Sequence, residues 1–337
     1  MTQKNPRRKP PTIMDVARLA GVSKSTVSRV IRGEETASPM ARDSVLKAVE
    51  ALNYLPIAEL RNVSKAAEPT IGLLISAIDT PIFAHLNSYL HTELQEMGYH
   101  VVQETVVSTD PDYVHGQLLN LLSLHVDGLI IASGAVKNFV FLELTRKIPL
   151  LLIGRPDFTD TLHFLAYDEE HHAELIINHL AQLGHKNIIV QTTRQEYSAG
   201  SWLRSVLVEQ RAIAAGINIR MDDMQEIEDY TQWLQEIIST EYTAVVCMHD
   251  RELLKTWRAL REIGKDAPTD LSLTGSDGIA EGIEFLGYST IRKPIEEVAK
   301  RGAELIVSMI REEPHQPIRE LFKGYFIPGR TTGPPRI

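Results

Sequence analysis

The 337-residue chain contains a single cysteine, Cys247, and this scarcity excludes several kinds of site. One thiol cannot form an internal disulfide, and without neighbouring thiols it indicates no zinc site. No window approaches the roughly 18 consecutive apolar residues of a membrane-spanning helix. The N-terminal stretch MTQKNPRRKPP also lacks the apolar segment of a secretory signal. We therefore expect a cytoplasmic protein that makes no membrane contact, with Cys247 buried in a strand.

The usual signatures of catalysis are missing too. The sequence has no G-x-x-x-x-G-K-[ST], no G-x-G-x-x-G after a strand, no G-x-S-x-G and no H-E-x-x-H. The adjacent His171 and His172 diverge by about 100° on a helix, so they do not form the i, i+4 pair that binds a metal. We expect both imidazoles to face solvent. The sequence therefore predicts no enzyme, no cofactor and no metal.

Charge is divided unevenly along the chain. Residues 1–65 contain 12 Lys and Arg against 6 Asp and Glu, a net charge of +6, and the remaining residues contain 23 against 38, a net charge of −15. A basic module on an acidic body is typical of a phosphate-binding head joined to a domain with another task. The length of the chain also predicts two or three domains.

The basic segment has the periodicity of three short helices. Apolar residues recur every three or four positions over 13–20, where Thr12 can cap the helix, and Gly21 then allows a tight turn. Ser23 can cap a second helix that runs to about residue 32, and a third helix begins near residue 38. Two helices joined by so short a turn are typical of a helix-turn-helix.

The second helix has one apolar face and one hydrogen-bonding face. Its apolar side chains are Val27, Val30 and Ile31, and its polar side chains are Ser25, Ser28, Arg29 and Arg32. An α-helix fits the major groove of DNA, where Arg bonds guanine bidentately. The polar face therefore indicates base reading by Lys24, Ser25 and Arg29. On this pattern alone, a helical bundle with a charged surface is the alternative.

Two consecutive stretches identify the head more specifically. TIMDVARLAGVSKSTVSRVIRG, followed by SPMARDSVLKAVEALNYLP, resembles the DNA-binding head of the lactose and galactose repressor (LacI/GalR) family of bacterial transcriptional regulators. The resemblance implies a homodimer that binds double-stranded operator DNA, most simply as a repressor. It puts Lys24, Ser25 and Arg29 at base-contacting positions. Positions that touch phosphate or support the helix are Thr12, Ser23, Thr26 and Ser28, and Arg32 continues the same surface.

Residues 57–68 join the head to the body and contain no glycine or proline. They favour a helix of about two or three turns, which is too short to hold in water without a partner such as DNA or the other subunit. The resemblance implies a hinge helix that enters the minor groove, with Arg61 and Val63 at the DNA. Val63 is the residue that would insert between base pairs, and it is smaller than the usual leucine. A plain tether is the alternative.

From residue 70 the chain alternates short apolar runs with amphipathic stretches. TIGLLIS is followed by a helical pattern and by YHVVQETVV, and the series continues with GLIIAS, PLLLIG, NIIVQT, AVVCM and LSLTGS. The alternation predicts parallel sheets covered by helices on both faces, so the fold class is α/β behind an all-α head. Ligands of such sheets bind beyond the carboxyl ends of the strands.

The body resembles the sensor domain of the same family, whose two Rossmann-like lobes have the fold of periplasmic sugar-binding proteins. The segments that carry the resemblance include DTPIF at Asp79, GRP at Gly154, HD at His249 and STIRKP at Ser289. The implied domains are a helix-turn-helix domain at 1–56, a hinge at 57–68, one lobe at 69–165 plus 293–327, and a second lobe at 166–292.

The resemblance also implies an effector site between the lobes. Arg204 matches an arginine that holds effector hydroxyls or a carboxylate, Asp277 an acid at a strand end, and Tyr230 an aromatic ring that packs on the ligand. A guanidinium and a carboxylate suit vicinal hydroxyls, and a ring suits the apolar face of a sugar. From the residues alone, a helix charge, a turn former and a core ring are the plainer roles. Further candidates in the matched segments are Phe83, Arg155 and His249.

Three departures from the family pattern leave the effector open. Gly154 replaces a common aspartate, Ala132 occupies a position where polar groups line the pocket, and His249 replaces a common asparagine. We expect a sugar, with a sugar phosphate, a nucleobase or no effector as the alternatives. A sugar-binding protein without a DNA role is a further alternative, but it would carry a secretory signal and lack the basic head.

Overall fold

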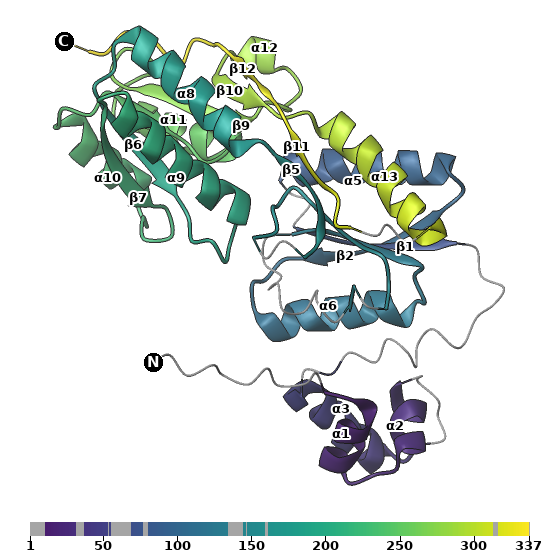
Figure 1. The fold of residues 1–337 in the computed structure, drawn as a ribbon. Coiled ribbons are helices and arrows are strands. Elements are labelled where there is room, and N and C mark those ends of the chain that lie inside the picture. The colour runs from purple at the N-terminus through teal and green to yellow at the C-terminus, as the bar shows by residue number, and fades with distance from the viewer. Residues whose placement is uncertain are drawn as a thin grey trace, which may run out of the picture.

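The computed structural model describes residues 11–31, 37–52, 54, 69–76, 80–133, 144–145, 147–158, 161–312 and 316–336. The fold is mixed α/β: a three-helix head is followed by two lobes, each built on a six-stranded sheet (Figure 1). The predicted hinge at 57–68, with Arg61 and Val63, lies outside the described residues, as does Arg32. Among the described residues, no helix is both long and apolar enough to cross a membrane.

The head consists of α1 (Ile13–Ala20), α2 (Lys24–Ile31) and α3 (Pro39–Leu52). One residue from each helix is completely buried in the centre of the head: Val16, Val27 and Val45. Gly21 ends α1 in the left-handed conformation at φ 68°, which glycine adopts without steric cost, and the chain turns there into α2. The apolar spacing of the sequence therefore produces a small core, against which Leu119 of the first lobe also packs.

The first lobe is an entirely parallel sheet with the strand order β11-β5-β4-β3-β1-β2. Helices α5 and α13 cover one face and α6 covers the other (Figure 1). The strands are β1 (Thr70–Ser76), β2 (His100–Val106), β3 (Gly128–Ala132), β4 (Leu150–Ile153), β5 (His163–Tyr167) and β11 (Arg319–Phe322). The helices are α5 (Pro81–Glu96), α6 (Pro111–Ser123) and α13 (Ile295–Arg311).

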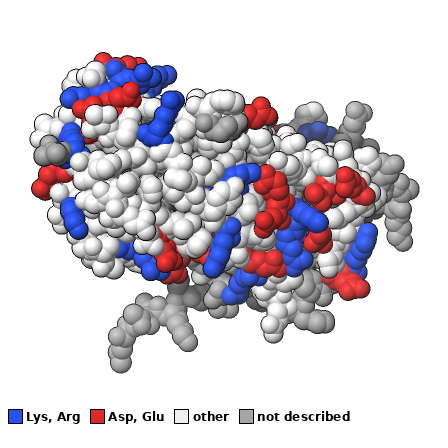
Figure 2. Space-filling view, turned by 90° about the horizontal axis from the view of Figure 1, so that it is seen from above, with Lys and Arg blue, Asp and Glu red and all other residues white. Residues whose placement is uncertain are grey.

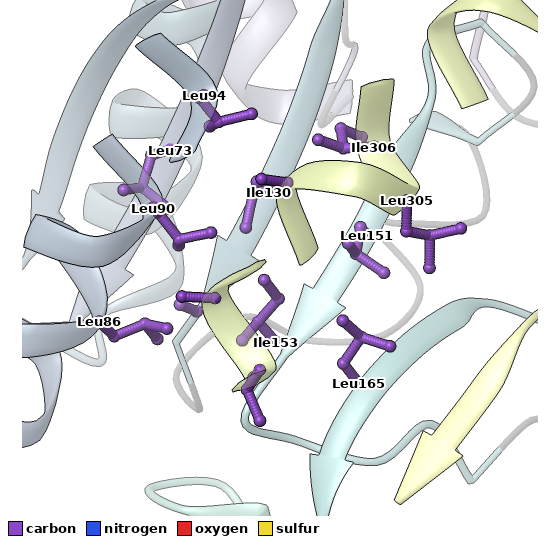
Figure 3. Close-up of a cluster of buried hydrophobic side chains, with 14 of the residues drawn as sticks. Leu73, Leu86, Leu90, Leu94, Ile130, Leu151, Ile153, Leu165, Leu305 and Ile306 are labelled. Carbon is purple, nitrogen blue, oxygen red and sulfur yellow. The ribbon is translucent and has the colours of Figure 1, made fainter. Parts of the chain in front are cut away.

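Because helices cover both faces of this sheet, its central strands are apolar along their whole length. All five residues of β3 and all four of β4 are buried. Figure 3 shows how Leu90 of α5 and Ile306 of α13 point toward Ile130 of β3 and Leu151 of β4. The long continuous apolar runs of the sequence are thus the interior of a three-layer lobe.

The second lobe repeats this arrangement, with the strand order β12-β10-β9-β8-β6-β7. Helices α8 and α9 pack on one face, and α10 and α11 pack on the other. The strands are β6 (Asn187–Thr192), β7 (Asn218–Asp223), β8 (Ala244–Val246), β9 (Ser272–Asp277), β10 (Ser289–Arg292) and β12 (Tyr325–Ile327). The helices are α8 (Glu169–Leu183), α9 (Ala199–Ala214), α10 (Tyr230–Ile238), α11 (Asp250–Glu262) and the short α12 (Ile283–Leu286).

The chain passes between the lobes three times: after β5, after β10, and between β11 and β12. Assignment of residues 325–327 to the first lobe is wrong, because β12 pairs antiparallel with β10 in the second sheet, where Phe326 lies opposite Ile291. A three-residue strand at a sheet edge has too few side chains for its sequence to indicate which sheet it joins. The three passages meet at the carboxyl ends of the parallel strands, where a ligand is expected.

Charge on the body is mixed. Figure 2 shows acidic and basic side chains interspersed over one face of the molecule, without a large field of either sign. Arg301 of α13, for example, donates to both carboxylate oxygens of Glu320 on β11. This face therefore offers no basic field for the phosphates of DNA, in contrast to the basic composition of residues 1–65.

Candidate DNA-reading helix and interlobe cavity

Side-chain caps hold the start of both helices in the helix-turn-helix. Asp15 Oδ2 accepts hydrogen bonds from the backbone N–H of Thr12 at 2.9 Å and from its hydroxyl at 2.7 Å, and these bonds lower the pKa of Asp15. The hydroxyl of Ser23 accepts from the N–H of Thr26 at 3.1 Å and lies 2.8 Å from the hydroxyl of that threonine. Thr12, Ser23 and Thr26 therefore position the helices, whichever of them also contacts DNA.

Helix α2 has the two faces that its sequence predicts. Val27 and Val30 are buried against α1 and α3, whereas Lys24 and Ser25 are exposed. The half-buried Arg29 donates from Nε to the carbonyl oxygen of Ser25 at 3.3 Å, which holds its guanidinium along the exposed face. Ser28 is also half-buried. A short polar helix standing out from a rigid core suits insertion into a major groove.

A cavity of about 270 Å³ lies between the two lobes. Its hydroxyl groups come from both lobes, and three aromatic rings complete the wall. The serine and threonine residues are Ser76, Thr80, Ser198 and Ser201, and the rings belong to Phe83, Tyr167 and Tyr197, of which the two tyrosines also carry hydroxyls. Charged and titratable side chains in the wall are Glu169, His249, Arg251, Glu252 and Lys293. A second cavity of about 510 Å³ adjoins α11 and includes Asp250 and Asp277.

Arg204 and Glu169 form a buried ion pair beside the first cavity, in which one guanidinium nitrogen contacts both carboxylate oxygens. Nη1 of Arg204 donates to Oε1 and Oε2 of Glu169 at 3.0 and 2.9 Å, and Nη2 donates to the carbonyl oxygen of Met248. The exposed fractions of these residues are only 3% and 5%. Burial by itself raises the pKa of Glu169. Arg204, His172 and Lys293 have the larger, opposite effect and bring the pKa down to about 2. The carboxylate is therefore ionised and held by a fixed partner.

His172 extends this pair to the passage between β11 and β12. Its Nδ1 lies 3.2 Å from Oε2 of Glu169, and its Nε2 accepts the N–H of Gly324 at 3.0 Å. The expectation that His172 faces solvent is wrong: the side chain is fully buried, because this face of α8 packs under the crossing strand. Burial lowers the pKa of His172, in keeping with a neutral ring that accepts at Nε2.

A second buried ion pair joins β9 to the passage after β10. Nζ of Lys293 donates to Oδ1 of Asp277 at 2.8 Å and lies 5.0 Å from the centroid of the Tyr167 ring. Asp277 has φ 146°, a backbone conformation that residues other than glycine rarely adopt. The pKa of Asp277 is raised by burial but lowered more strongly by Lys293 and His249, so the carboxylate is ionised. A strained backbone thus aims a charged group at the junction of the lobes.

Comparisons with known proteins match both parts of the chain. Residues 12–56 match the model of bacterial regulatory proteins of the lacI family, and residues 177–332 match a periplasmic binding protein-like domain. The ribose operon repressor of Haemophilus influenzae is 28% identical over 318 residues, which cover 92% of this chain and 95% of the repressor. GalR of Escherichia coli is 26% identical over 338 residues, or 97% of both chains. The chain belongs to the LacI/GalR family.

Solved structures give the same fold for this LacI/GalR regulator. The lac repressor dimer bound to operator and the anti-inducer ONPF has a TM-score of 0.68 at 23% identity, covering 96% of this chain and 100% of that chain. A LacI family regulator from Enterococcus faecium with bound ribose also has a TM-score of 0.68, covering 79% and 99%. These relatives are named as transcriptional regulators and repressors, so this family member is a DNA-binding regulator of transcription and not an enzyme.

The structure brings only some of the predicted effector residues of this LacI/GalR regulator together. Phe83 and His249 line the smaller cavity, and Asp277 borders the larger one. Arg204 adjoins the smaller cavity through Glu169 but is not part of its wall. Arg155 is buried in the first lobe, where Nη1 donates to the carbonyl oxygen of Ser133 at 3.0 Å. Tyr230 begins α10, packs edge-on against Trp233 and is not among the residues that line either cavity.

Most residues of the cavity wall escaped the sequence prediction, among them Glu169, Ser201 and Lys293. Ser201 lies 3.0 Å from Nε2 of His249, and Lys293 is the partner of Asp277. Lys293 lies in the STIRKP segment, next to a predicted crossing between the lobes. This position was the one feature of the sequence that could have indicated that Lys293 lies at the cavity. Glu169 opens α8 and resembles any acid in the first turn of a helix. No pattern in the sequence distinguishes it from its neighbour Glu170.

Proposed function

We propose that this regulator binds double-stranded operator DNA as a homodimer, and that a small hydroxylated molecule, most simply a sugar, binds between the lobes and changes operator affinity. The observation that carries the proposal is the interlobe cavity, since residues of both lobes line it and all three chain passages meet beside it. A ligand in this position contacts both lobes at once. Its binding energy therefore favours one relative arrangement of the lobes over others.

The chemistry of the cavity wall suits a sugar. Hydroxyls of Thr80 and Ser201, the imidazole of His249 and the carboxylate of Glu169 offer both donors and acceptors to ring hydroxyls. The ring of Phe83 offers a flat apolar surface for a sugar face. The volume of about 270 Å³ is suited to a small ligand of monosaccharide size. Among the relatives, a ribose operon repressor and a regulator with bound ribose support this class.

DNA binding is assigned to the outer face of α2. Lys24, Ser25 and Arg29 are the proposed base-reading residues, and Thr12, Ser23, Thr26 and Ser28 the residues that support α2 or touch phosphate. A dimer would present two such helices to two half-sites of a roughly palindromic operator. The lac repressor dimer bound to operator supports this arrangement. Ligand binding then acts by changing the spacing of the two heads.

The test combines two measurements on the full chain. Operator sequences are first selected from random duplex DNA, and monosaccharides are screened by thermal shift, where a ligand at a hundred times its dissociation constant stabilises by about 2.7 kcal/mol. Hits are then added to a fluorescence anisotropy titration with the selected operator. We expect at least one sugar to change operator affinity at least fivefold, in either direction. A hit that leaves operator affinity unchanged would contradict the proposed coupling.

A further inference from the structure

The two buried cations at the interlobe cavity, Arg204 and Lys293, have carboxylate partners within the protein, whereas Arg251 is an exposed residue of the cavity wall. Both oxygens of Glu169 are bound to Nη1 of Arg204, and Nη2 of the same guanidinium is bound to the carbonyl oxygen of Met248. Nζ of Lys293 is bound to Asp277, and its side chain is only 4% exposed. An anionic ligand would have to break one of these pairs to reach a buried cation, and it would leave a buried carboxylate without a counter-ion.

In the pair of Arg204 and Glu169, the carboxylate faces the cavity and the guanidinium does not. Glu169 belongs to the cavity wall, whereas Arg204 does not. Oε1 of Glu169 also lies 3.6 Å from the place that a Cβ on Gly200 would occupy, which puts it against the wall formed by the start of α9. A ligand in the cavity therefore meets a negative group, with the positive charge on the far side of it.

The N-termini of α8, α9 and α11 near the cavity carry acids or a capping hydroxyl, whereas that of α5 carries neither. Helix α8 begins with Glu169 and Glu170, and α11 begins with Asp250 and includes Glu252 in its first turn. At the start of α9, the hydroxyl of Ser198 accepts the N–H of Ser201 at 3.3 Å. A helix N-terminus attracts anions through unpaired N–H groups and its positive dipole end. The acids in the first turns of α8 and α11 and the hydroxyl of Ser198 therefore offset the attraction of these helix ends for a phosphate.

We propose that Glu169 is a specificity-determining residue: as the internal counter-ion of Arg204, it reserves the cavity for uncharged polyhydroxy ligands and excludes sugar phosphates and other anions. The ligand class rests on the function proposed above, whereas the exclusion of anions rests only on the ion pair. A hydroxyl donates to a carboxylate that has lone pairs to spare, but a phosphate oxygen is repelled by it. Removal of the negative charge of Glu169 therefore allows an anion to bind Arg204.

The decisive variant is Glu169→Gln, which keeps the size of the side chain and removes its charge. The matched control is Glu170→Gln, because Glu170 is the next residue of α8, is 64% exposed and pairs with Arg211. Inorganic phosphate is the probe, compared with chloride at equal ionic strength, and melting temperature and titration calorimetry are the readouts. We expect phosphate, relative to chloride, to stabilise Glu169→Gln more than it stabilises the wild type or Glu170→Gln.

A double variant, Glu169→Gln with Arg204→Gln, identifies the site of phosphate binding. We expect it to lose the phosphate response, since the guanidinium is gone. Equal effects of phosphate and chloride on Glu169→Gln would overturn the proposal, and so would a phosphate response of the wild type that Arg204→Gln removes. Should Glu169→Gln fold poorly, the refolding yield replaces the melting temperature. A yield that rises with phosphate alone supports the proposal, and equal yields overturn it.

A matched pair of ligands, D-ribose and D-ribose 5-phosphate, links this result to the proposed function. If the wild type binds ribose, we expect the phosphate ester to bind at least tenfold more weakly, and Glu169→Gln to reduce that ratio at least tenfold. Wild type that binds the ester as tightly as the sugar overturns the exclusion of anions and leaves effector binding intact. Failure of every sugar in the screen counts against the proposed function, while the inorganic phosphate experiment still decides the role of Glu169.

Discussion

Nζ of Lys293 donates to Oδ1 of Asp277 at 2.8 Å, and both side chains are almost completely buried. The pair joins the end of β9 in the second lobe to the passage that leads into α13 of the first lobe. It therefore lies where any change in the arrangement of the lobes must be transmitted.

Lys293→Met is expected to destabilise the protein by about 3 to 5 kcal/mol, because it leaves Asp277 charged and buried without a counter-ion. Urea denaturation at pH 7 measures the loss in free energy of unfolding. The control is Lys255→Met, which breaks a pair with Glu252 in which the lysine side chain is 43% exposed. Such a pair contributes about 0 to 1 kcal/mol. Equal effects of the two variants would contradict the structural role of the Lys293 pair.

The buried His172 should make the stability of the protein depend on pH below neutrality. Burial lowers the pKa of His172 in the folded protein below the ordinary value of 6.5, although Glu169 opposes the shift. The unfolded chain then binds a proton more readily than the folded protein does. The contribution of His172 is complete above about pH 6.5 and is lost as the pH falls below it, by at most about 1.4 kcal/mol per pH unit.

We therefore expect His172→Gln to lose less stability than the wild type between pH 6.5 and pH 5, since glutamine does not titrate and still accepts the Gly324 N–H. Urea denaturation at a series of pH values measures this slope. His171→Gln, at the half-buried neighbour on the same helix, is the control for the effect of a histidine-to-glutamine change. An unchanged slope in His172→Gln would rule out this role.

Gly200→Ala should stabilise the protein and weaken effector binding at the same time. An added Cβ at Gly200 meets the carbonyl oxygen of Gly154 at 3.5 Å and Oε1 of Glu169 at 3.6 Å, which are ordinary contacts. The gain is about 0.4 to 1 kcal/mol, because alanine restricts the unfolded chain. Gly200 also lines the cavity, so the methyl group reduces the space for a ligand. Thermal unfolding and calorimetry with the effector measure the two effects.

The control for this prediction is Gly116→Ala on α6, where an added Cβ meets no atom within 4 Å. It should give a similar gain in stability without any change in effector affinity. If both variants bind the effector as the wild type does, Gly200 does not border the effector site.

Arg29→Ala should relax the preference for individual bases in the operator, because a good base contact contributes about 1 to 3 kcal/mol of discrimination. Selection from random duplex DNA, followed by competition binding, measures the preference at each position. Arg18→Ala on α1 removes the same charge from a residue whose side chain is 79% exposed. It should lower affinity for all sequences alike, if at all. Unchanged base preference in Arg29→Ala would refute its role in base reading.

Much of the architecture is determined by local sequence. The apolar spacing over 13–20, the cap at Ser23 and the left-handed glycine at position 21 predict α1, the turn and α2, because caps and turns depend on residues only a few positions apart. The alternation of apolar runs with amphipathic stretches likewise predicts two α/β lobes, since parallel strands need covering helices. The family resemblance rests on these same segments.

The character of the cavity depends on contacts between distant residues. Glu169 and Arg204 are 35 positions apart, and His172 meets the backbone of a residue 152 positions further along the chain. Arg204 on its own predicts a free cation for a ligand, and only the fold supplies the carboxylate that occupies it. The sequence by itself thus determined a DNA-binding head and a two-lobed α/β body. Tertiary structure decided which charges face the cavity, because burial and ion pairing arise only once the chain passes between the lobes.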